Sequence, residues 1–246
     1  MAIDATRPRL VLWDIDHTLI ETRGTGGRLA RAAFQEITGI RPDRMAVATG
    51  KTEPVILAET LLAHGIRPTE EHQRRYAETL PEQYRRHIDQ LRQGGRALPG
   101  AAEALAALNQ VPGLIQAVLT GNYRAVAAVK LAAFHLDGIL DLEVGAYADD
   151  AADRAALVPI AQRRAGRKYQ RAFTRVNTVI IGDTTHDVAA AHQGGAAIIA
   201  VTSGHHTADD LRAAGADIVL TSLADTAAVL RAVNATTPPA THRLTE

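Results

Sequence analysis

Short apolar segments alternate with segments of helical period through the second half of the sequence, and this alternation limits the folds that the chain can adopt. The apolar segments predict strands at 114–119, 142–144, 176–181, 196–201 and 217–220. Between them, apolar residues recur at the spacing of one helix face. Strands that alternate with helices pair in parallel, because each helix carries the chain back across the sheet. We therefore predict an α/β fold with a doubly wound parallel sheet.

The first predicted strand, at 9–14, stands apart from this pattern. A long stretch of helical character follows it, with helices predicted at 29–37, 55–64 and 70–91. The simplest organisation, which a chain of 246 residues allows, is an α/β core formed by 1–20 and 97–234 and interrupted by a helical cap at 21–96. Residues 235–246 contain two prolines and several threonines and are predicted to form a disordered tail.

Polar residues follow three of the predicted strands. Ligands of doubly wound sheets bind at the carboxyl ends of strands, so these residues are the candidates for a site. Asp14 and Asp16 end the first strand, and their carboxylates could act as nucleophile and general acid/base, or could bind a hard cation. The second group consists of Thr120, Gly121 and Asn122, whose donors suit an oxyanion. The third group consists of Asp183 and Asp187, which add two more carboxylates.

The composition excludes several other classes of function. The chain has no cysteine, and therefore has no disulfide, thiolate metal site or cysteine nucleophile. Its 27 basic and 27 acidic residues balance, which argues against a nucleic-acid-binding protein held by bulk charge. The sequence offers neither a signal peptide nor an apolar segment of membrane-spanning length, so we expect a soluble, cytoplasmic protein.

Together these motifs resemble those of the haloacid dehalogenase superfamily of phosphohydrolases, in the helical-cap subclass and similar to phosphoglycolate phosphatases. Asp-Ile-Asp-His-Thr-Leu at 14–19 looks like the family's first motif, Thr120 like the second and the segment 182–187 like the fourth. The helical stretch directly after the first motif, and the return to the core at 98–100, match the order of the family. The resemblance covers roughly 10–230 and implies a Rossmann-like core.

The resemblance implies a role for each of these residues. Asp14 attacks phosphorus and becomes an aspartyl phosphate, Asp16 protonates the leaving oxygen and then activates water, and Thr18 orients Asp16. Mg²⁺ is expected at the Asp14 carboxylate, the Asp16 backbone carbonyl, Asp183 and Asp187. The phosphoryl oxygens are expected to be bound by Thr120, Gly121 and Asn122. The metal and these donors neutralise the phosphate, which otherwise repels the attacking carboxylate.

The third motif of the family normally supplies a lysine beside the nucleophile, and lysine is scarce here. Among the 27 basic residues, only Lys51, Lys130 and Lys168 are lysines. None of them lies at 149–159, where the resemblance places this motif, so Arg154 is the candidate for the cationic role. Lys130 is the alternative, although lysines placed as Lys130 and Lys168 are more often solvated. Arginine supplies charge and a fork of donors, but it does not replace lysine neutrally.

Gly50, Lys51 and Thr52 lie between predicted helices and resemble the specificity loop of phosphoglycolate-phosphatase-like members. In this interpretation Lys51 could reach an acidic group on the substrate. The alternative is a plain helix start, in which Thr52 caps a helix that has Pro54 in its first turn.

The resemblance therefore implies a Mg²⁺-dependent phosphatase, a phosphoric monoester hydrolase that acts on a small phosphorylated metabolite and has no nucleic-acid or membrane partner. Two alternatives stay open. A phosphomutase of the same superfamily would return the phosphoryl group from Asp14 to the substrate. The departure at the third motif also allows a non-catalytic member that binds a metabolite or a partner. Either a monomer or a homodimer is expected.

Overall fold

Five parallel strands form the main sheet of the computed structural model, which describes residues 8–237. The strands are β1 (Arg9–Trp13), β4 (Leu114–Val118), β5 (Thr178–Gly182), β6 (Ala197–Val201) and β7 (Ile218–Leu220). They lie in the order β4-β1-β5-β6-β7, and each neighbouring pair is parallel. The predicted α/β fold with a doubly wound parallel sheet is confirmed. This order places the carboxyl ends of β4, β1 and β5 side by side.

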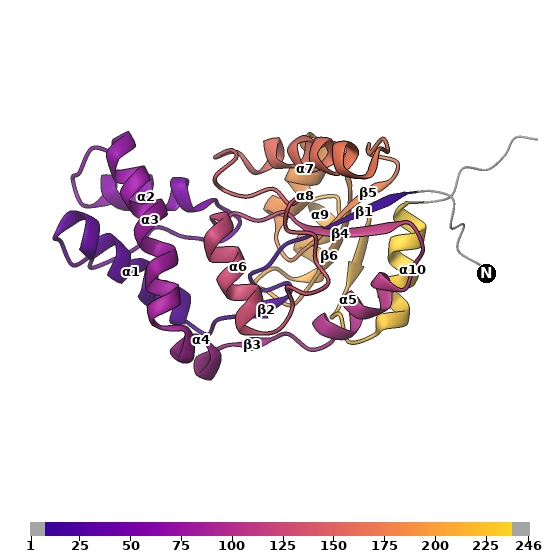
Figure 1. Ribbon diagram of the computed structural model, residues 1–246, viewed down its shortest axis with the longest axis horizontal. Coiled ribbons are helices and arrows are strands. Elements are labelled where there is room, and N and C mark those ends of the chain that lie inside the picture. The colour runs from indigo at the N-terminus through magenta and orange to yellow at the C-terminus, as the bar shows by residue number, and fades with distance from the viewer. Residues whose placement is uncertain (1–7, 238–246) are drawn as a thin grey trace, which may run out of the picture.

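Helices cover both faces of this sheet because its central strands are apolar on both sides. These helices are α5 (Ala101–Asn109), α6 (Arg124–Ala133), α7 (Arg154–Tyr169), α8 (Thr185–Gly194), α9 (Ala208–Ala213) and α10 (Thr226–Thr236). Val11 and Trp13 of β1 belong to the apolar cluster that includes α5 and α10, whereas Leu10 and Leu12 belong to the cluster that includes α7 and α8. The alternation of strand side chains thus separates two apolar layers, and Figure 1 shows α7 and α5 on opposite sides of the strands.

The remaining helices form a group of their own beside the sheet (Figure 1). They are α1 (Thr25–Thr38), α2 (Glu53–Ala63), α3 (Glu70–Arg86) and α4 (Ile88–Gly94). Their apolar core includes Phe34, Leu57 and Tyr76, and it is completed by Tyr123 and Val126 at the start of α6. The helix group therefore rests on the sheet-bearing part of the chain through α6.

A small antiparallel ladder marks the two points where the chain enters and leaves this helix group. Strand β2 (Ile20–Glu21) pairs with strand β3 (Arg96–Ala97), with Ile20 opposite Ala97. Because each strand has only two residues, the sequence carries no periodicity from which it could be predicted.

Some local predictions are wrong. The segment 142–144 forms a turn, and the parallel bridge in this region joins Leu119 to Ala146 instead. The helix predicted at 70–91 ends at Arg86, because the backbone of His87 (φ −115°, ψ 28°) leaves the helical region.

The predicted tail begins too early in the sequence. Ala235 and Thr236, which were predicted to belong to it, lie within α10, and residues 238–246 lie outside the described residues. No helix within residues 8–237 is both long and apolar enough to cross a membrane.

Candidate active site

A cavity of about 550 Å³ lies where the carboxyl ends of β4, β1 and β5 face the helix group α1–α4. Most of the predicted site residues line it. From the sheet-bearing part come Asp14, Asp16, Thr120, Gly121, Asn122, Arg154 and Asp183, and from the loop before α2 come Gly50 and Lys51. Thr18, Thr52 and Asp187 do not line the cavity, but they contact residues or loops around it.

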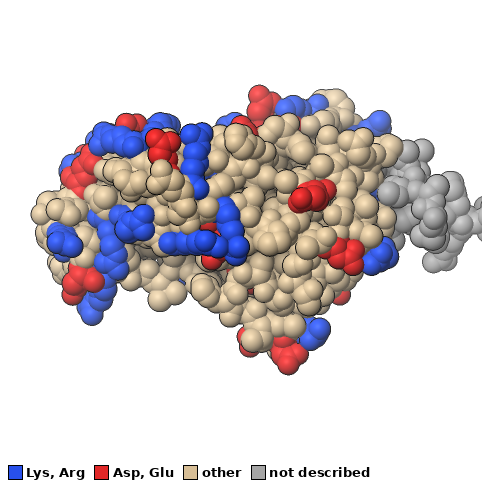
Figure 2. Space-filling view, turned by 90° about the horizontal axis from the view of Figure 1, so that it is seen from below, with Lys and Arg blue, Asp and Glu red and all other residues tan. Residues whose placement is uncertain are grey.

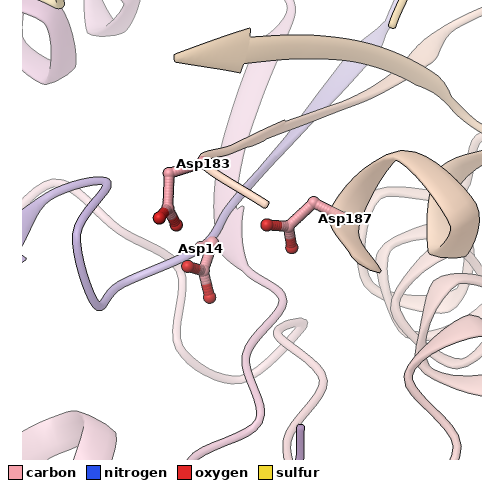
Figure 3. A group of neighbouring side chains, drawn as sticks. All are labelled: Asp14, Asp183 and Asp187. Carbon is pink, nitrogen blue, oxygen red and sulfur yellow. The ribbon is translucent and has the colours of Figure 1, made fainter. Parts of the chain in front are cut away.

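Three carboxylates meet at the ends of β1 and β5. Asp14 directly follows β1, Asp183 directly follows β5, and Asp187 lies in the first turn of α8, so that the three side chains converge (Figure 3). One oxygen of each lies within 4.8 Å of the others, and all three residues are buried. Burial raises the pKa of Asp14 and Asp183, and the charges of the neighbouring aspartates raise the pKa of both further, although Arg154 opposes this.

This group of carboxylates fits a divalent cation. Carboxylate oxygens are the ligands that Mg²⁺ and Ca²⁺ prefer. The Oδ1 atom of Asp187 is a buried acceptor that receives no hydrogen bond from residues 8–237, and its one charged contact is the Arg154 guanidinium, with Nη2 at 2.6 Å. Its Oδ2 accepts the backbone N–H and the hydroxyl of Thr184, at 3.0 and 2.7 Å, within the capping box of α8. The capping box therefore fixes the orientation of the Asp187 carboxylate toward the other two.

Thr18 does not take the place that was expected of it. Its buried hydroxyl donates to Asp183 Oδ1 at 3.3 Å rather than orienting Asp16. The cause is a tight turn after Asp16, in which His17 adopts φ 60° and its N–H donates to the Ile20 carbonyl at 2.7 Å. This turn directs Thr18 toward β5.

The cation in contact with Asp14 is Arg154, the first residue of α7. Its Nη2 lies 2.6 Å from Asp14 Oδ1 and 2.6 Å from Asp187 Oδ1, and only 10% of its side chain is exposed. Asp153 caps the helix by accepting the N–H of Ala155 at 3.1 Å, which fixes the start of α7 at this point. Burial lowers the pKa of the guanidinium, but the surrounding aspartates outweigh it and raise the pKa, so the group stays charged.

Asp16 is held by a second network, on the β4 side of the cavity. The Nζ atom of Lys130, on α6, donates to Asp16 Oδ1 and Oδ2 at 2.8 and 2.7 Å, and Asn122 Nδ2 donates to Oδ2 at 2.8 Å. Burial raises the pKa of Asp16, but Lys130 and Asn122 outweigh it and hold the pKa below its ordinary value. The expectation that Lys130 is solvated is wrong, because its side chain is only 4% exposed.

Thr120 connects this network to the loop after β4. Its fully buried hydroxyl oxygen accepts the backbone N–H of Asn122 at 3.2 Å and the Asn122 side-chain amide at 2.8 Å. The loop is therefore ordered by its own side chains before any ligand binds. Lys168, by contrast, lies on the surface, where it pairs with Asp141 and Glu143.

The loop before α2 reaches across from the helix group and touches the sheet-bearing part at two places. The Thr52 hydroxyl donates to the Ala152 carbonyl at 2.9 Å and makes no capping bond to α2. The N–H of Glu53 donates to the Gly121 carbonyl at 2.8 Å. Thr52 thus links the loop before α2 to the sheet-bearing part of the chain. The predicted helix start is nevertheless present, because α2 begins at Glu53.

Lys51 and Gly50 occupy the rim of the cavity. Lys51 Nζ lies 2.6 Å from Glu59 Oε2, on α2. Gly50 has φ 68°, and a Cβ atom at this position would overlap the His186 imidazole. Glycine at position 50 therefore serves both the turn and the close approach of the two parts.

Gly121 lies where the loop after β4 approaches the loop before α2, and its replacement tests the contact between these two loops. A Cβ atom at Gly121 would overlap the Lys51 carbonyl oxygen. For the phosphatase activity that the sequence leads us to expect, Gly121→Ala should displace the loop and lower kcat/KM about 10- to 100-fold, because misplacing a group by about 1 Å costs about that much. Gly138→Ala is the control, since nothing lies within 4 Å of its added Cβ. Equal kcat/KM for the two variants would contradict a functional contact here.

Several residues of the cavity were missed by sequence reasoning. They include Glu53, Tyr84, Arg23 and Arg31 from the helix group. His205, in the loop after β6, also lines the cavity; its place after a predicted strand is a signal in the sequence, although the pair His205-His206 lacks, nearby in the sequence, the third ligand that a zinc site needs. Burial raises the pKa of Glu53 to about 7, although Lys130 opposes this.

The helix group also gives one side of the molecule a basic surface. Figure 2 shows Lys and Arg side chains gathered over the half of this face that α1–α4 form, with few over the other half. Arg23, Arg31 and Lys51 carry this character into the cavity. Basic groups at the mouth of a cleft raise the local concentration of anions, so the site favours a negatively charged ligand.

Comparison with known proteins agrees with this chemistry. The model of a protein family described as haloacid dehalogenase-like hydrolase matches residues 11–192. A curated protein, the probable phosphatase IndB of Dickeya dadantii (strain 3937), is 29% identical over 223 residues, which cover 88% of this chain and 90% of that protein.

Solved structures share the fold. A hydrolase from Pseudomonas syringae matches with a TM-score of 0.66 and 24% identity, covering 92% of this chain and 99% of that one. A predicted phosphoglycolate phosphatase from Haemophilus somnus 129PT matches with a TM-score of 0.63 and 19% identity, covering 92% of this chain and 99% of that one. At these identities the likeness concerns the arrangement of strands and helices.

Proposed function

Because the chain belongs to the haloacid dehalogenase-like hydrolase family, we propose that it is a Mg²⁺-dependent phosphatase that hydrolyses the phosphoric monoester of a small metabolite. The observation that carries the proposal is the position of Asp14 in the cavity. Its carboxylate is in contact with the Arg154 guanidinium, and Asp16 lines the same cavity. A carboxylate nucleophile, a cation and a second carboxyl group are what transfer of a phosphoryl group to an aspartate requires.

The reaction proceeds in two steps. In the first, an oxygen of Asp14 bonds to phosphorus, the bond from phosphorus to the ester oxygen breaks, and Asp16 gives a proton to that oxygen. In the second, a water oxygen bonds to phosphorus, the bond from phosphorus to Asp14 breaks, and the proton of the water passes to Asp16. Inorganic phosphate leaves and Asp14 is regenerated.

The charge of the phosphate has to be offset for this attack. Mg²⁺, held by Asp14, Asp183 and the Asp16 backbone carbonyl, with Asp187 beside them, would supply positive charge where two anions meet. Arg154 holds an oxygen of Asp14 at 2.6 Å and takes the place of the family's lysine. Thr120 and the backbone N–H groups of Gly121 and Asn122 bind the phosphoryl oxygens, for which the Asn122 N–H leaves the Thr120 hydroxyl oxygen that it contacts at 3.2 Å.

The substrate is small and carries a second acidic group, in the manner of phosphoglycolate. The cavity of about 550 Å³ is within the usual range for small-molecule sites. Lys51 supports the proposal because its pairing with Glu59 is partly exposed, at 29% and 43% of the two side chains. Exposed ion pairs contribute little to stability, so Lys51 is free to exchange Glu59 for an acidic group of the substrate.

The test is phosphate release from a panel of sugar phosphates, phosphoglycolate and nucleotides. We expect turnover of at least one small ester, loss of that turnover when EDTA removes divalent cations, and recovery when Mg²⁺ is restored. Turnover that is unaffected by EDTA would contradict the role of the metal.

The same assay separates the alternatives. A phosphomutase would need a bisphosphate activator and would release little free phosphate. Failure to turn over any ester while Mg²⁺ still binds would favour a non-catalytic, metabolite-binding member of the family. A cytoplasmic location and a monomeric or dimeric state stay predictions from the sequence.

A further inference from the structure

Lys130 is a buried charged residue to which the reaction above assigns no part. An ammonium group has three N–H donors and no acceptor. All three find acceptors here, namely Asp16 Oδ1 at 2.8 Å, Asp16 Oδ2 at 2.7 Å and Asn122 Oδ1 at 2.7 Å. The ring of Tyr84 covers the ammonium, with its centroid 5.4 Å from Nζ. Lys130 therefore has no donor left for a phosphate group.

Asn122 completes the arrangement from the other side. Its Oδ1 accepts from Lys130, and this orients the amide so that Nδ2 donates to Asp16 Oδ2 at 2.8 Å and to Thr120 Oγ1 at 2.8 Å. The Asp16 carboxylate thus accepts three hydrogen bonds from two residues. Its side chain is nevertheless 37% exposed, whereas that of Lys130 is 4% exposed. The carboxylate is fixed on its inner side and open toward the cavity.

We propose that Lys130 is a positioning residue, which fixes the Asp16 carboxylate in the place where it accepts the proton of the water that hydrolyses the phosphorylated Asp14. The inference rests on the proposed phosphatase reaction. In this step the water oxygen bonds to phosphorus, the bond from phosphorus to the Asp14 oxygen breaks, and the water proton moves to Asp16. Both oxygens of Asp16 accept from Lys130 Nζ, so the ammonium fixes the direction of the carboxylate that receives this proton.

The two buried cations of the site thus contact different aspartates of the proposed reaction. Arg154 contacts Asp14 and Asp187, and Lys130 contacts Asp16. Lys130 makes no ion pair with Asp14 among the described residues. It therefore does not stand in for the lysine of the third motif. When the leaving group needs no proton, the loss of Lys130 should slow the second step of the reaction rather than the first.

Lys130→Met, which keeps the length of the side chain and removes its charge, separates the two steps when p-nitrophenyl phosphate is the substrate. Its leaving group departs without a proton, so kcat/KM reports the transfer of the phosphoryl group to Asp14. We expect kcat to fall about 100-fold, because general base catalysis by a positioned group contributes at least about that much. We expect kcat/KM to stay within about tenfold of the wild-type value, so that KM falls with kcat.

The phosphorylated protein itself provides a readout that a merely structural role would not change. When its hydrolysis is slow, Lys130→Met should release one p-nitrophenolate per site in a burst, and the intact protein should gain the mass of one phosphoryl group. Adding Asp14→Asn to Lys130→Met should remove both signals. Lys130→Arg should recover part of kcat, because a guanidinium can reach both carboxylate oxygens.

Lys168→Met is the matched control, since Lys168 is the exposed lysine that pairs with Asp141 and Glu143, and it should match the wild type in every measurement. A fall in kcat/KM as large as that in kcat, with no burst, would overturn the role of Lys130 while leaving the phosphatase reaction intact. Absence of both turnover and phosphorylation in the wild type would overturn the phosphatase reaction and this inference together.

Discussion

Asp14→Asn is expected to lower phosphate release from p-nitrophenyl phosphate by about 10⁴-fold or more, which is the scale of losses seen when a nucleophile is removed. The amide has the shape of the carboxylate but does not attack phosphorus, and no other carboxylate of the cavity occupies its position beside Arg154. The measurement is the steady-state rate with Mg²⁺ present. Asp209→Asn, on a side chain that is 94% exposed, is the control and should retain the wild-type rate. A wild-type rate for Asp14→Asn would refute the assignment of the nucleophile.

The same variant should change the response of the metal-free protein to pH. Burial and neighbouring aspartates raise the pKa of Asp14 and Asp183. The folded chain therefore binds more protons than the unfolded chain above about pH 4, where aspartates ordinarily titrate, and its stability falls as pH rises through the raised pKa values. Asp14→Asn removes one of these groups. In EDTA, the melting temperature of this variant should therefore fall less than that of the wild type between about pH 5 and about pH 8, the range over which the difference in bound protons develops.

Arg154→Met is expected to have the second large effect, on stability as well as on activity. It leaves the buried carboxylates of Asp14, Asp183 and Asp187 without the cation that contacts two of them. Removing one partner of a buried ion pair costs about 3–5 kcal/mol, because the other charge remains buried. We expect the free energy of unfolding at neutral pH in EDTA to fall by about that amount, and Mg²⁺ to restore part of it by binding the same carboxylates.

Denaturant unfolding in EDTA and in Mg²⁺ measures both effects. Arg163→Met is the matched control, because Arg163 is an exposed residue on the same helix, α7. Arg154→Lys should fall between the wild type and Arg154→Met, since one ammonium keeps the charge but lacks the planar fork. If Arg154→Met unfolds at the same denaturant concentration as the wild type in EDTA, the ion pairs of Arg154 do not stabilise the fold.

The strand ends were predictable from the sequence because local pattern and topology agree there. Asp14, Thr120 and Asp183 each follow an apolar segment, and a parallel sheet brings the carboxyl ends of such segments to one edge. Periodicity and the known rule for parallel sheets thus suffice to place them. The contact of Asp14 with Arg154 depends on where α7 starts, and Asp153, which caps that helix, supplies a signal for this start.

The partner of Lys130, by contrast, could not be predicted from local pattern and topology. It lies four residues after Val126 and three after Ala127, both of which are buried, so helical spacing already places it on the inner face of α6. Its partner Asp16, however, is 114 residues away in sequence. Nothing in the local pattern predicts which carboxylate a buried lysine will meet, because the meeting depends on how α6 packs beside β1. The same holds for Thr52, whose bond to Ala152 spans 100 residues.

The ladder between β2 and β3 has a consequence for how such a protein can change over evolution. By pairing Ile20 with Ala97, it brings together the two ends of the segment that contains α1–α4. A segment whose ends already meet can be lengthened, shortened or exchanged for another without altering the order of the strands beneath it. In the proposed phosphatase, the residues proposed for the chemistry and the residues proposed to contact the rest of the substrate then lie in separate stretches of chain. Substitutions in the segment that contains α1–α4 can then change the substrate while the rest of the chain keeps its sequence.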